Sequence, residues 1–250
     1  MKRRIVAALA CRNQGSRLYG KPLQNLDVAS SVRIIDNIIG CIRAIGFIDE
    51  IVLGISEGVD NEVFKVVAQE KGLRYIVGDQ QDVLSRLIQC GQIAGATDIF
   101  RVTSESPFLY FDPVLELWEK HKLENADATF MDDVIDGCGF EILSLKALQT
   151  SHDKGSKKHR SELCTLYIRE NYEQFKIIKA TPPQNLIRKD LRLTVDNPED
   201  LIVCRAVYAN FKDSAPSVPV AKVVEFLDQN PKLKELIAPF TEAGYSTMYL

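Results

Sequence analysis

The sequence predicts an α/β fold of the Rossmann-like type, a mostly parallel mixed sheet with helices on both faces. Short apolar runs of strand length alternate with longer segments in which apolar residues recur at helical spacing. This alternation repeats at short intervals, as expected for β-α-β units whose strands lie parallel in one sheet. Because no linker clearly divides the 250 residues, we expect one domain over residues 1–250, with a smaller substrate or dimerisation excursion around residues 130–190.

Strands and helices are expected to alternate regularly in the first half of the chain. Residues 4–9 form an apolar run that is long enough for a buried strand and too short for most helices. The segment 32–46 carries isoleucines at helical spacing, and Ser30 or Ser31 can cap the helix that it predicts. Gly72 is expected to end a later helix as its C-terminal glycine. Further strands are expected at 50–55, 73–77 and 98–102, and further helices at 61–71, 82–95 and 112–123.

The second half of the chain predicts a less regular arrangement. The pair Asn197-Pro198 is typical of a helix start, and His121, on a charged helix face, is expected to face solvent. The charged run DKGSKKHR at 153–160 predicts a mobile surface loop, with a lid over the substrate as the alternative. Strands are expected at 128–131, 139–143, 175–180 and 191–195, and helices at 144–151, 161–171, 197–210 and 220–228.

A basic loop directly follows the first expected strand. It contains Arg12, Arg17 and Lys21, with Gly15 and Gly20 between them. Such a loop suits a polyphosphate, because glycines let main-chain amides approach phosphate oxygens while guanidinium forks and an ammonium neutralise their charge. The alternative interpretation is a solvated basic loop with no ligand.

Polar side chains also follow the other expected strands. Because ligands of open parallel sheets bind beyond the carboxyl ends of the strands, we expect these side chains to converge. They are Asp79, Asp82, Thr103, Ser104, Glu105, Ser106 and Asp196. Glu105 and Asp196 are the expected oxygen ligands of Mg²⁺, which is typically held by one or two carboxylates and by substrate phosphates. A basic loop facing two carboxylates predicts nucleotidyl transfer. The alternative for Asp196 is a helix cap before Pro198.

Composition excludes several classes of partner. With 31 Lys and Arg against 34 Asp and Glu, the net charge of −3 argues against a broad nucleic-acid or membrane footprint. No stretch approaches the roughly 20 apolar residues of a membrane span, so we expect a cytoplasmic protein. The six cysteines are widely spaced without a CxxC pair, which favours buried free thiols over disulfides or a zinc site.

The basic loop carries a resemblance to a known family. RNQGSRLYGKPL (12–23) resembles the RxxSxRLPGKxL signature of the CMP-sugar synthetases, which include the 3-deoxy-manno-octulosonate and acylneuraminate cytidylyltransferases. More closely, the chain resembles the cytidylyltransferase-like proteins of the spore-coat polysaccharide biosynthesis group. The matching blocks continue in family order with GDQQDVLSRL (78–87), RVTSESPF (101–108), GCGFEI (137–142) and LRLTVDNPEDL (191–201).

This resemblance implies a nucleotide-diphospho-sugar transferase fold, CTP as donor, Mg²⁺ as cofactor, release of pyrophosphate and a homodimer. It implies that Arg12 and Lys21 are the catalytic contacts to the triphosphate, with Arg17 nearby, and that Asp196 is a metal ligand. The other residues expected to line the nucleotide pocket are Ala10, Asp82, Arg101, Thr103 and Ser104. The expected enzyme is a cytidylyltransferase (EC 2.7.7 class) that transfers CMP to an acidic sugar or related acceptor for a surface glycan.

Four positions depart from the family pattern: Gly15, Tyr19, Glu105 and Gly139 stand where Ser, Pro, Asp and Asp are usual. The longer arm of Glu105 changes how that carboxylate reaches a metal, and Gly139 leaves the acceptor open. Two alternatives therefore remain. One is a glycosyltransferase of the related nucleotide-sugar fold, for which Asp132-Asp133 is a poor imitation of a DxD motif. The other is a non-catalytic, nucleotide-binding member of the family.

Overall fold

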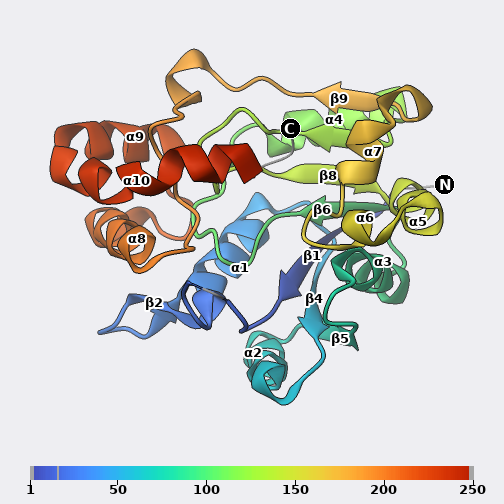
Figure 1. Ribbon diagram of the computed structural model, residues 1–250, viewed down its shortest axis with the longest axis horizontal. Coiled ribbons are helices and arrows are strands. Elements are labelled where there is room, and N and C mark those ends of the chain that lie inside the picture. The colour runs from blue at the N-terminus through green and yellow to red at the C-terminus, as the bar shows by residue number, and fades with distance from the viewer. Residues whose placement is uncertain (1–2, 16, 248–250) are drawn as a thin grey trace.

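A seven-stranded mixed sheet forms the centre of the computed structural model (Figure 1). The structure describes residues 3–15 and 17–247, with no side chains described beyond residue 242. The strand order is β5-β4-β1-β6-β8-β7-β9, in which β8 runs antiparallel to both of its neighbours and the other pairs are parallel. Its strands are β1 (Ile5–Cys11), β4 (Glu50–Ser56), β5 (Arg74–Gly78), β6 (Asp98–Arg101), β7 (Ala128–Phe130), β8 (Glu141–Ser144) and β9 (Ile177–Lys179).

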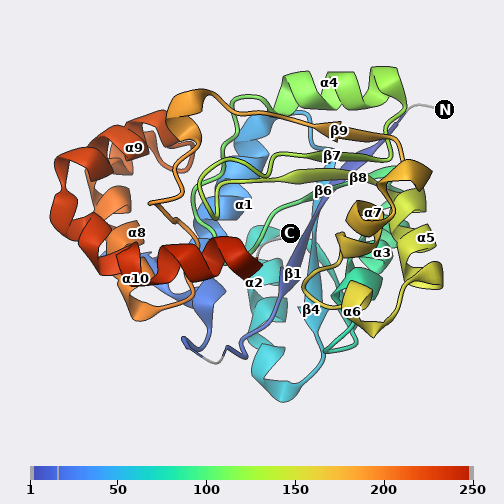
Figure 2. The ribbon, with the colours of Figure 1, turned by 45° about the horizontal axis from the view of Figure 1, so that its top comes forward.

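Helices cover both faces of this sheet, as the alternating pattern predicts. The central strand β1 sends Ile5, Ala7 and Leu9 into one apolar core and Val6 and Ala8 into the other. The first core receives side chains of α1 (Ile34–Ile45), α2 (Val63–Lys71), α4 (Val114–Glu124), α8 (Pro198–Asn210) and α9 (Val220–Gln229). The second receives those of α3 (Val83–Ala94), α5 (Leu145–Lys154) and α7 (Leu166–Glu170). Figure 2 shows α3, α5 and α7 grouped beside the sheet, away from α8 and α9. The predicted fold class is confirmed.

The structure differs from the sequence-based elements in five main places. The expected strand at 191–195 does not form and leaves only an isolated bridge, between Asp136 and Arg192. The expected helix at 161–171 begins late, as α7, and part of the expected loop at 153–160 forms α6 (Lys157–Arg160). The sequence analysis missed the small hairpin of β2 (Asn25–Asp27) and β3 (Val32–Arg33). It also missed α10 (Pro231–Thr247), which packs against α8 and α9.

His121 is buried, so the prediction that it faces solvent is wrong. Its Nδ1 lies 2.8 Å from the Thr129 hydroxyl and its Nε2 3.2 Å from the Asp98 carboxylate. Asp98 is also fully buried and accepts a 2.8 Å hydrogen bond from the Nε of Arg3. Burial alone would raise the pKa of Asp98, but the hydrogen bonds from His121, Arg3 and Thr97 outweigh it and lower the pKa. The contacts of His121 with Asp98 and Thr129 hold α4 against the sheet.

Replacing Asp98 by asparagine should lower the free energy of unfolding by about 3 kcal/mol at pH 7, because Arg3 loses a buried counter-charge and His121 loses a charged hydrogen-bond partner. A lowered folded-state pKa stabilises the protein above the unfolded pKa of about 4, and this stabilisation is lost as the pH falls. The difference between wild type and variant should therefore shrink below about pH 4. Urea unfolding across pH checks this, with exposed Asp153→Asn as the control; a pH-independent difference would contradict it.

All six cysteines are buried thiols, as the sequence predicts. Burial raises the pKa of Cys138 well above its ordinary value, which removes it from consideration as a nucleophile. Within the part of the chain that the structure describes, no helix combines the length and apolar character needed to cross a membrane.

Candidate active site

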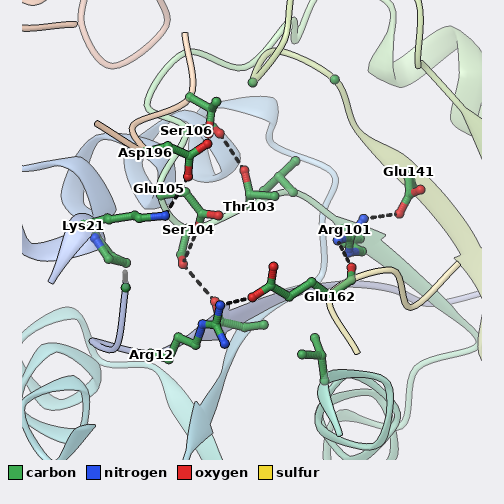
Figure 3. Close-up of a pocket in the computed structure, with 18 of the residues that line it drawn as sticks. Arg12, Lys21, Arg101, Thr103, Ser104, Glu105, Ser106, Glu141, Glu162 and Asp196 are labelled. Carbon is green, nitrogen blue, oxygen red and sulfur yellow. Dashed lines mark hydrogen bonds and ion pairs between the residues drawn. The ribbon is translucent and has the colours of Figure 1, made fainter. Parts of the chain in front are cut away.

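A cavity of about 590 Å³ opens at the carboxyl ends of β1 and β6, within the size range of small-molecule sites. The basic loop after β1 and the polar loop after β6 form two of its walls (Figure 3). Of the expected site residues, those that line it are Ala10, Arg12, Arg17, Lys21, Arg101, Thr103, Ser104, Glu105 and Asp196. The sheet topology therefore brings together residues that are far apart in the sequence.

The basic loop is held in a compact turn by its glycines. A Cβ at Gly15 would lie 2.3 Å from the carbonyl oxygen of Leu18, so any larger residue would displace the chain. Gly20 has a φ of 62° and donates its N–H to the carbonyl of Asn13 at 2.8 Å. Lys21 follows immediately, at the start of a short 3₁₀ turn (Lys21–Leu23), and its side chain extends into the cavity. Local backbone geometry thus places the cation where the sequence predicts it.

Asp196 is the carboxylate on which the cations of the cavity converge. Its Oδ1 accepts a 2.6 Å hydrogen bond from Lys21, and its Oδ2 lies 2.8 Å from Arg192 and 3.5 Å from Arg17. Burial alone would raise the pKa of Asp196, but the hydrogen bond from Lys21 and the three positive charges outweigh it and lower the pKa. Asp196 is therefore a carboxylate at neutral pH. The interaction of Lys21 with Asp196 joins positions 175 residues apart.

The alternative role of Asp196 as a helix cap is not what the structure shows. The N-cap of α8 is Asn197, which forms a capping box with Asp200. Asp200 Oδ2 accepts hydrogen bonds from the main-chain N–H groups of Asp196 and Asn197 at 3.0 and 2.8 Å. The backbone at Asp196 is thereby fixed while its side chain stays available to the cavity.

Glu105 lies beside Asp196 because a main-chain hydrogen bond connects their two segments. The N–H of Val195 donates to the carbonyl of Glu105 at 3.1 Å. The hydroxyl of Ser104 donates to the carbonyl of Ala10 at 2.8 Å and lies 3.2 Å from the Glu105 carboxylate. Figure 3 shows Glu105, Asp196 and Lys21 gathered on one wall of the cavity.

These carboxylates fit a magnesium ion that completes its coordination with phosphate oxygens and water. Buried Asp136 also lies on the cavity wall. Burial raises its pKa to about 6, and the negative charges of Asp196, Asp200 and Glu105 add to the effect of burial. Among the side chains that the structure describes, no group of three or more His, Cys, Asp or Glu residues could hold a metal ion on its own.

The opposite wall of the cavity is formed by ion pairs that the sequence analysis missed. The guanidinium of Arg12 pairs with Glu162, which lies just beyond α6. Arg101 donates to the buried carboxylate of Glu141 at 2.6 Å. Arg169 joins Glu141 to Asp132 at 2.8 and 2.6 Å. The carboxylates of this wall come from residues 130–190, the segment expected to bind the acceptor, whereas Arg12 and Arg101 come from the carboxyl ends of β1 and β6. No spacing pattern in the sequence reveals these partners, because they meet only through the tertiary fold.

Asp79, which was expected to converge at this edge, lies outside the cavity lining, and so does the expected pocket residue Asp82. Its carboxylate caps α3 by accepting a 2.7 Å hydrogen bond from the N–H of Ser85, and it lies 2.8 Å from His152 Nε2. A carboxylate directly before an apolar helix can cap that helix, and this is the role that Asp82 has in the structure. Thr103 keeps its expected place and donates to the Ser106 hydroxyl at 2.6 Å.

Comparison with known proteins extends this description. No family model matches the chain. The chain is 23% identical to MJ1063 of Methanocaldococcus jannaschii, an uncharacterised protein, over 97% of this chain and 98% of that one. It is 24% identical to the spore coat polysaccharide biosynthesis protein SpsF of Bacillus subtilis, over 91% of this chain and 95% of SpsF.

Solved structures share the fold. A cytidylyltransferase from Leptospira borgpetersenii matches with a TM-score of 0.79 at 20% identity, over 93% of this chain and 96% of that one. A CMP:2-keto-3-deoxy-manno-octonic acid synthetase complexed with CTP matches with a TM-score of 0.59 at 16% identity, over 83% of this chain and 99% of that one. The resemblance predicted from the sequence is confirmed: the chain has the cytidylyltransferase fold and is similar over most of its length to a spore-coat polysaccharide biosynthesis protein.

Proposed function

We propose that the protein is a Mg²⁺-dependent cytidylyltransferase. It transfers CMP from CTP to an acidic sugar or a related acceptor that bears a hydroxyl or phosphate, for a surface glycan, and releases pyrophosphate. The observation that carries the proposal is that Lys21 and Asp196 meet on one wall of a cavity that Arg12, Arg17 and Glu105 also line. Cations for a triphosphate and carboxylates for its metal are thus within reach of one ligand.

The chain's own residues account for binding and orientation of the nucleotide. Arg12 and Lys21 exchange their carboxylate partners, Glu162 and Asp196, for phosphate oxygens. Arg101, Thr103 and Ser104 line the pocket around the nucleoside. An acceptor oxygen held in line attacks the α-phosphorus, the bond to the β-phosphate oxygen breaks, and pyrophosphate leaves as the acceptor hydroxyl loses its proton. When bound, Mg²⁺ neutralises phosphate charge.

The acceptor is expected to bind against the wall from residues 130–190. Glu141 and Asp132 present carboxylates there, and these are paired with Arg101 of β6 and with Arg169. This mixed wall can bind hydroxyls and charged substituents of a sugar together. A cytoplasmic location and a homodimer stay predictions from the sequence.

A pyrophosphate-release screen tests the proposed function. Each of the four nucleoside triphosphates is incubated with Mg²⁺ and a panel of sugar acids, sugar phosphates and neutral sugars. We expect release with CTP and only in the presence of an acceptor, with a CMP adduct visible by mass spectrometry. Consumption of a nucleotide sugar without pyrophosphate would indicate the glycosyltransferase alternative. CTP binding without turnover across the panel would indicate the non-catalytic alternative.

Substitution of Glu105 tests whether its charge is needed. Glu105→Gln keeps the size and removes the charge, and should lower kcat/KM by about 10²-fold, as for the loss of one electrostatic contact to the transition state. Glu105→Asp keeps the charge with a shorter arm and should retain most of the activity. Both variants are compared by pyrophosphate release over a range of Mg²⁺ concentrations. Equal activity of wild type and Glu105→Gln would remove Glu105 from the site.

A further inference from the structure

Two arginines are almost completely buried, and they differ in what surrounds them. Arg86 is 1% exposed and Arg192 is 2% exposed. Arg192 lies 2.8 Å from Asp196, 3.3 Å from Asp200 and 3.7 Å from Asp136, so three carboxylates compensate its charge. Arg86 forms no ion pair with any residue that the structure describes. The negative charge of Asp79 acts to raise the pKa of Arg86, but no described carboxylate forms a salt bridge with this buried guanidinium.

The hydrogen bonds of Arg86 leave part of its donor capacity unused. Nη1 donates to the main-chain carbonyls of Gly54 at 2.9 Å and Cys11 at 3.3 Å. The buried Nε has no acceptor among the atoms that the structure describes. Burial lowers the pKa of Arg86 and the charge of Arg12 adds to this, while the charge of Asp79 opposes it without reversing the direction. A guanidinium is protonated throughout the working pH range even so. The protein thus keeps a desolvated cation that it satisfies only in part.

The surrounding backbone fixes the position of the Arg86 side chain. It projects from the first turns of α3 toward the carboxyl ends of β1 and β4, and it lines the same cavity as Arg12. A Cβ at Gly54 would lie 3.4 Å from Arg86 Cβ, and one at Gly78 only 2.9 Å from Arg86 Cγ. Glycine in the two adjacent strands therefore leaves a slot for the aliphatic part of the arginine.

The cationic side chains of the cavity differ in whether they form an ion pair with a carboxylate. Five cationic side chains line the cavity, and four of them form ion pairs with carboxylates: Arg12, Arg17, Lys21 and Arg101. Arg86, the most deeply buried, is the exception among the described residues. An anion that enters the cavity would gain a charge-assisted hydrogen bond at a site shielded from water, where such bonds are strongest.

We propose that Arg86 is a phosphate-binding residue of the nucleotide site, and that a phosphate group of the bound nucleotide is the counter-charge it lacks within the protein. This inference deepens the proposed function and rests on it for the identity of the nucleotide. The sequence analysis included Arg86 in the block GDQQDVLSRL without giving it a role. An arginine in an amphipathic helix pattern is ordinarily exposed, so its burial is visible only in the fold.

Calorimetric titration of Arg86→Met with CTP, pyrophosphate and cytidine tests the proposal. Methionine fills the slot without the charge. We expect the Kd for CTP to rise about tenfold or more, the value for one lost charge-assisted hydrogen bond. Binding of cytidine, which has no phosphate, should be unchanged, and Arg86→Lys should restore part of the affinity for CTP. Comparing the loss of affinity for CTP with the loss of affinity for pyrophosphate shows which phosphates Arg86 contacts.

The ligand-free variant provides a second measurement. Because Arg86 lacks a carboxylate partner, Arg86→Met should melt close to the wild-type temperature, whereas the matched variant Arg192→Met should melt well below it. Three results would overturn the proposal: wild-type affinity of Arg86→Met for CTP, an equal loss of affinity for cytidine, or failure of Arg86→Met to fold. Absence of both CTP and pyrophosphate binding in the wild type would also overturn it. Phosphate binding that depends on Arg86 but occurs without turnover would leave it standing and defeat only the proposed reaction.

Discussion

Replacing Asp196 by alanine should abolish pyrophosphate release from CTP, by about 10³-fold or more, and leave the fold intact. The carboxylate is the point on the cavity wall where Lys21, Arg17 and Arg192 converge, so no other side chain among the described residues can take over its contacts. The fold should survive because the start of α8 is fixed by Asn197 and Asp200 rather than by Asp196.

The measurement is a pyrophosphate-release assay combined with circular dichroism and thermal melting of the same preparations. Asp213→Ala, an exposed position on another segment, removes the same charge and is the matched control. It should keep wild-type activity. Near-normal turnover in Asp196→Ala would show that the metal and triphosphate bind elsewhere. Loss of activity accompanied by unfolding would show that Asp196 is needed for the fold instead.

Replacing Arg192 by methionine should lower the free energy of unfolding by about 3–5 kcal/mol. Asp200 is completely buried, and Asp136 nearly so, and both depend on this guanidinium for a counter-charge. Arg192 also donates to the carbonyl of Phe240 at 2.9 Å, which ties α10 to the segment before Asp196. Its loss removes a buried charge network and also a contact between α10 and the segment before Asp196.

Arg188→Met is the matched control, because Arg188 also pairs with two carboxylates, those of Asp190 and Asp228, at the surface. Exposed ion pairs are weak, so this variant should lose about 1 kcal/mol or less. Urea unfolding of both variants at pH 7 gives the comparison. Equal losses would show that burial of the Arg192 network does not matter for stability.

The fold class could be predicted from the sequence because its signal is local. The buried run of β1 and the isoleucines of α1 each carry the correct periodicity within one short window. Local signals were also enough to locate the basic loop, where Gly15 and Gly20 shape the turn that presents Lys21. The prediction that one domain covers residues 1–250 stays a prediction.

The meeting of Lys21 and Asp196 could be predicted from topology alone, since polar residues after parallel strands converge. The strand expected before Asp196 does not form, yet the bridge between Asp136 and Arg192 holds this segment at the same edge of the sheet. Main-chain pairing of Val195 with Glu105 completes the site. Its carboxylates lie together even though one of the expected strands does not form.

What the sequence could not reveal depends on tertiary contacts. His121 lies on a helix with many charges, and only packing against Asp98 and Thr129 shows that it is buried. Glu162 meets Arg12 through a segment about 150 residues away in the chain, with no motif to mark the pair. Arg86 is hidden for the same reason. Periodicity identifies a helix, but it does not identify which polar residue points inward.

The most direct test is a crystal structure of the protein with CTP and with Mn²⁺ in place of Mg²⁺, in which an anomalous difference map locates the manganese. We expect one manganese peak between Glu105 and Asp196, and a triphosphate contacted by Arg12 and Lys21. Nucleotide density elsewhere on the molecule, or a manganese peak without either carboxylate, would contradict it.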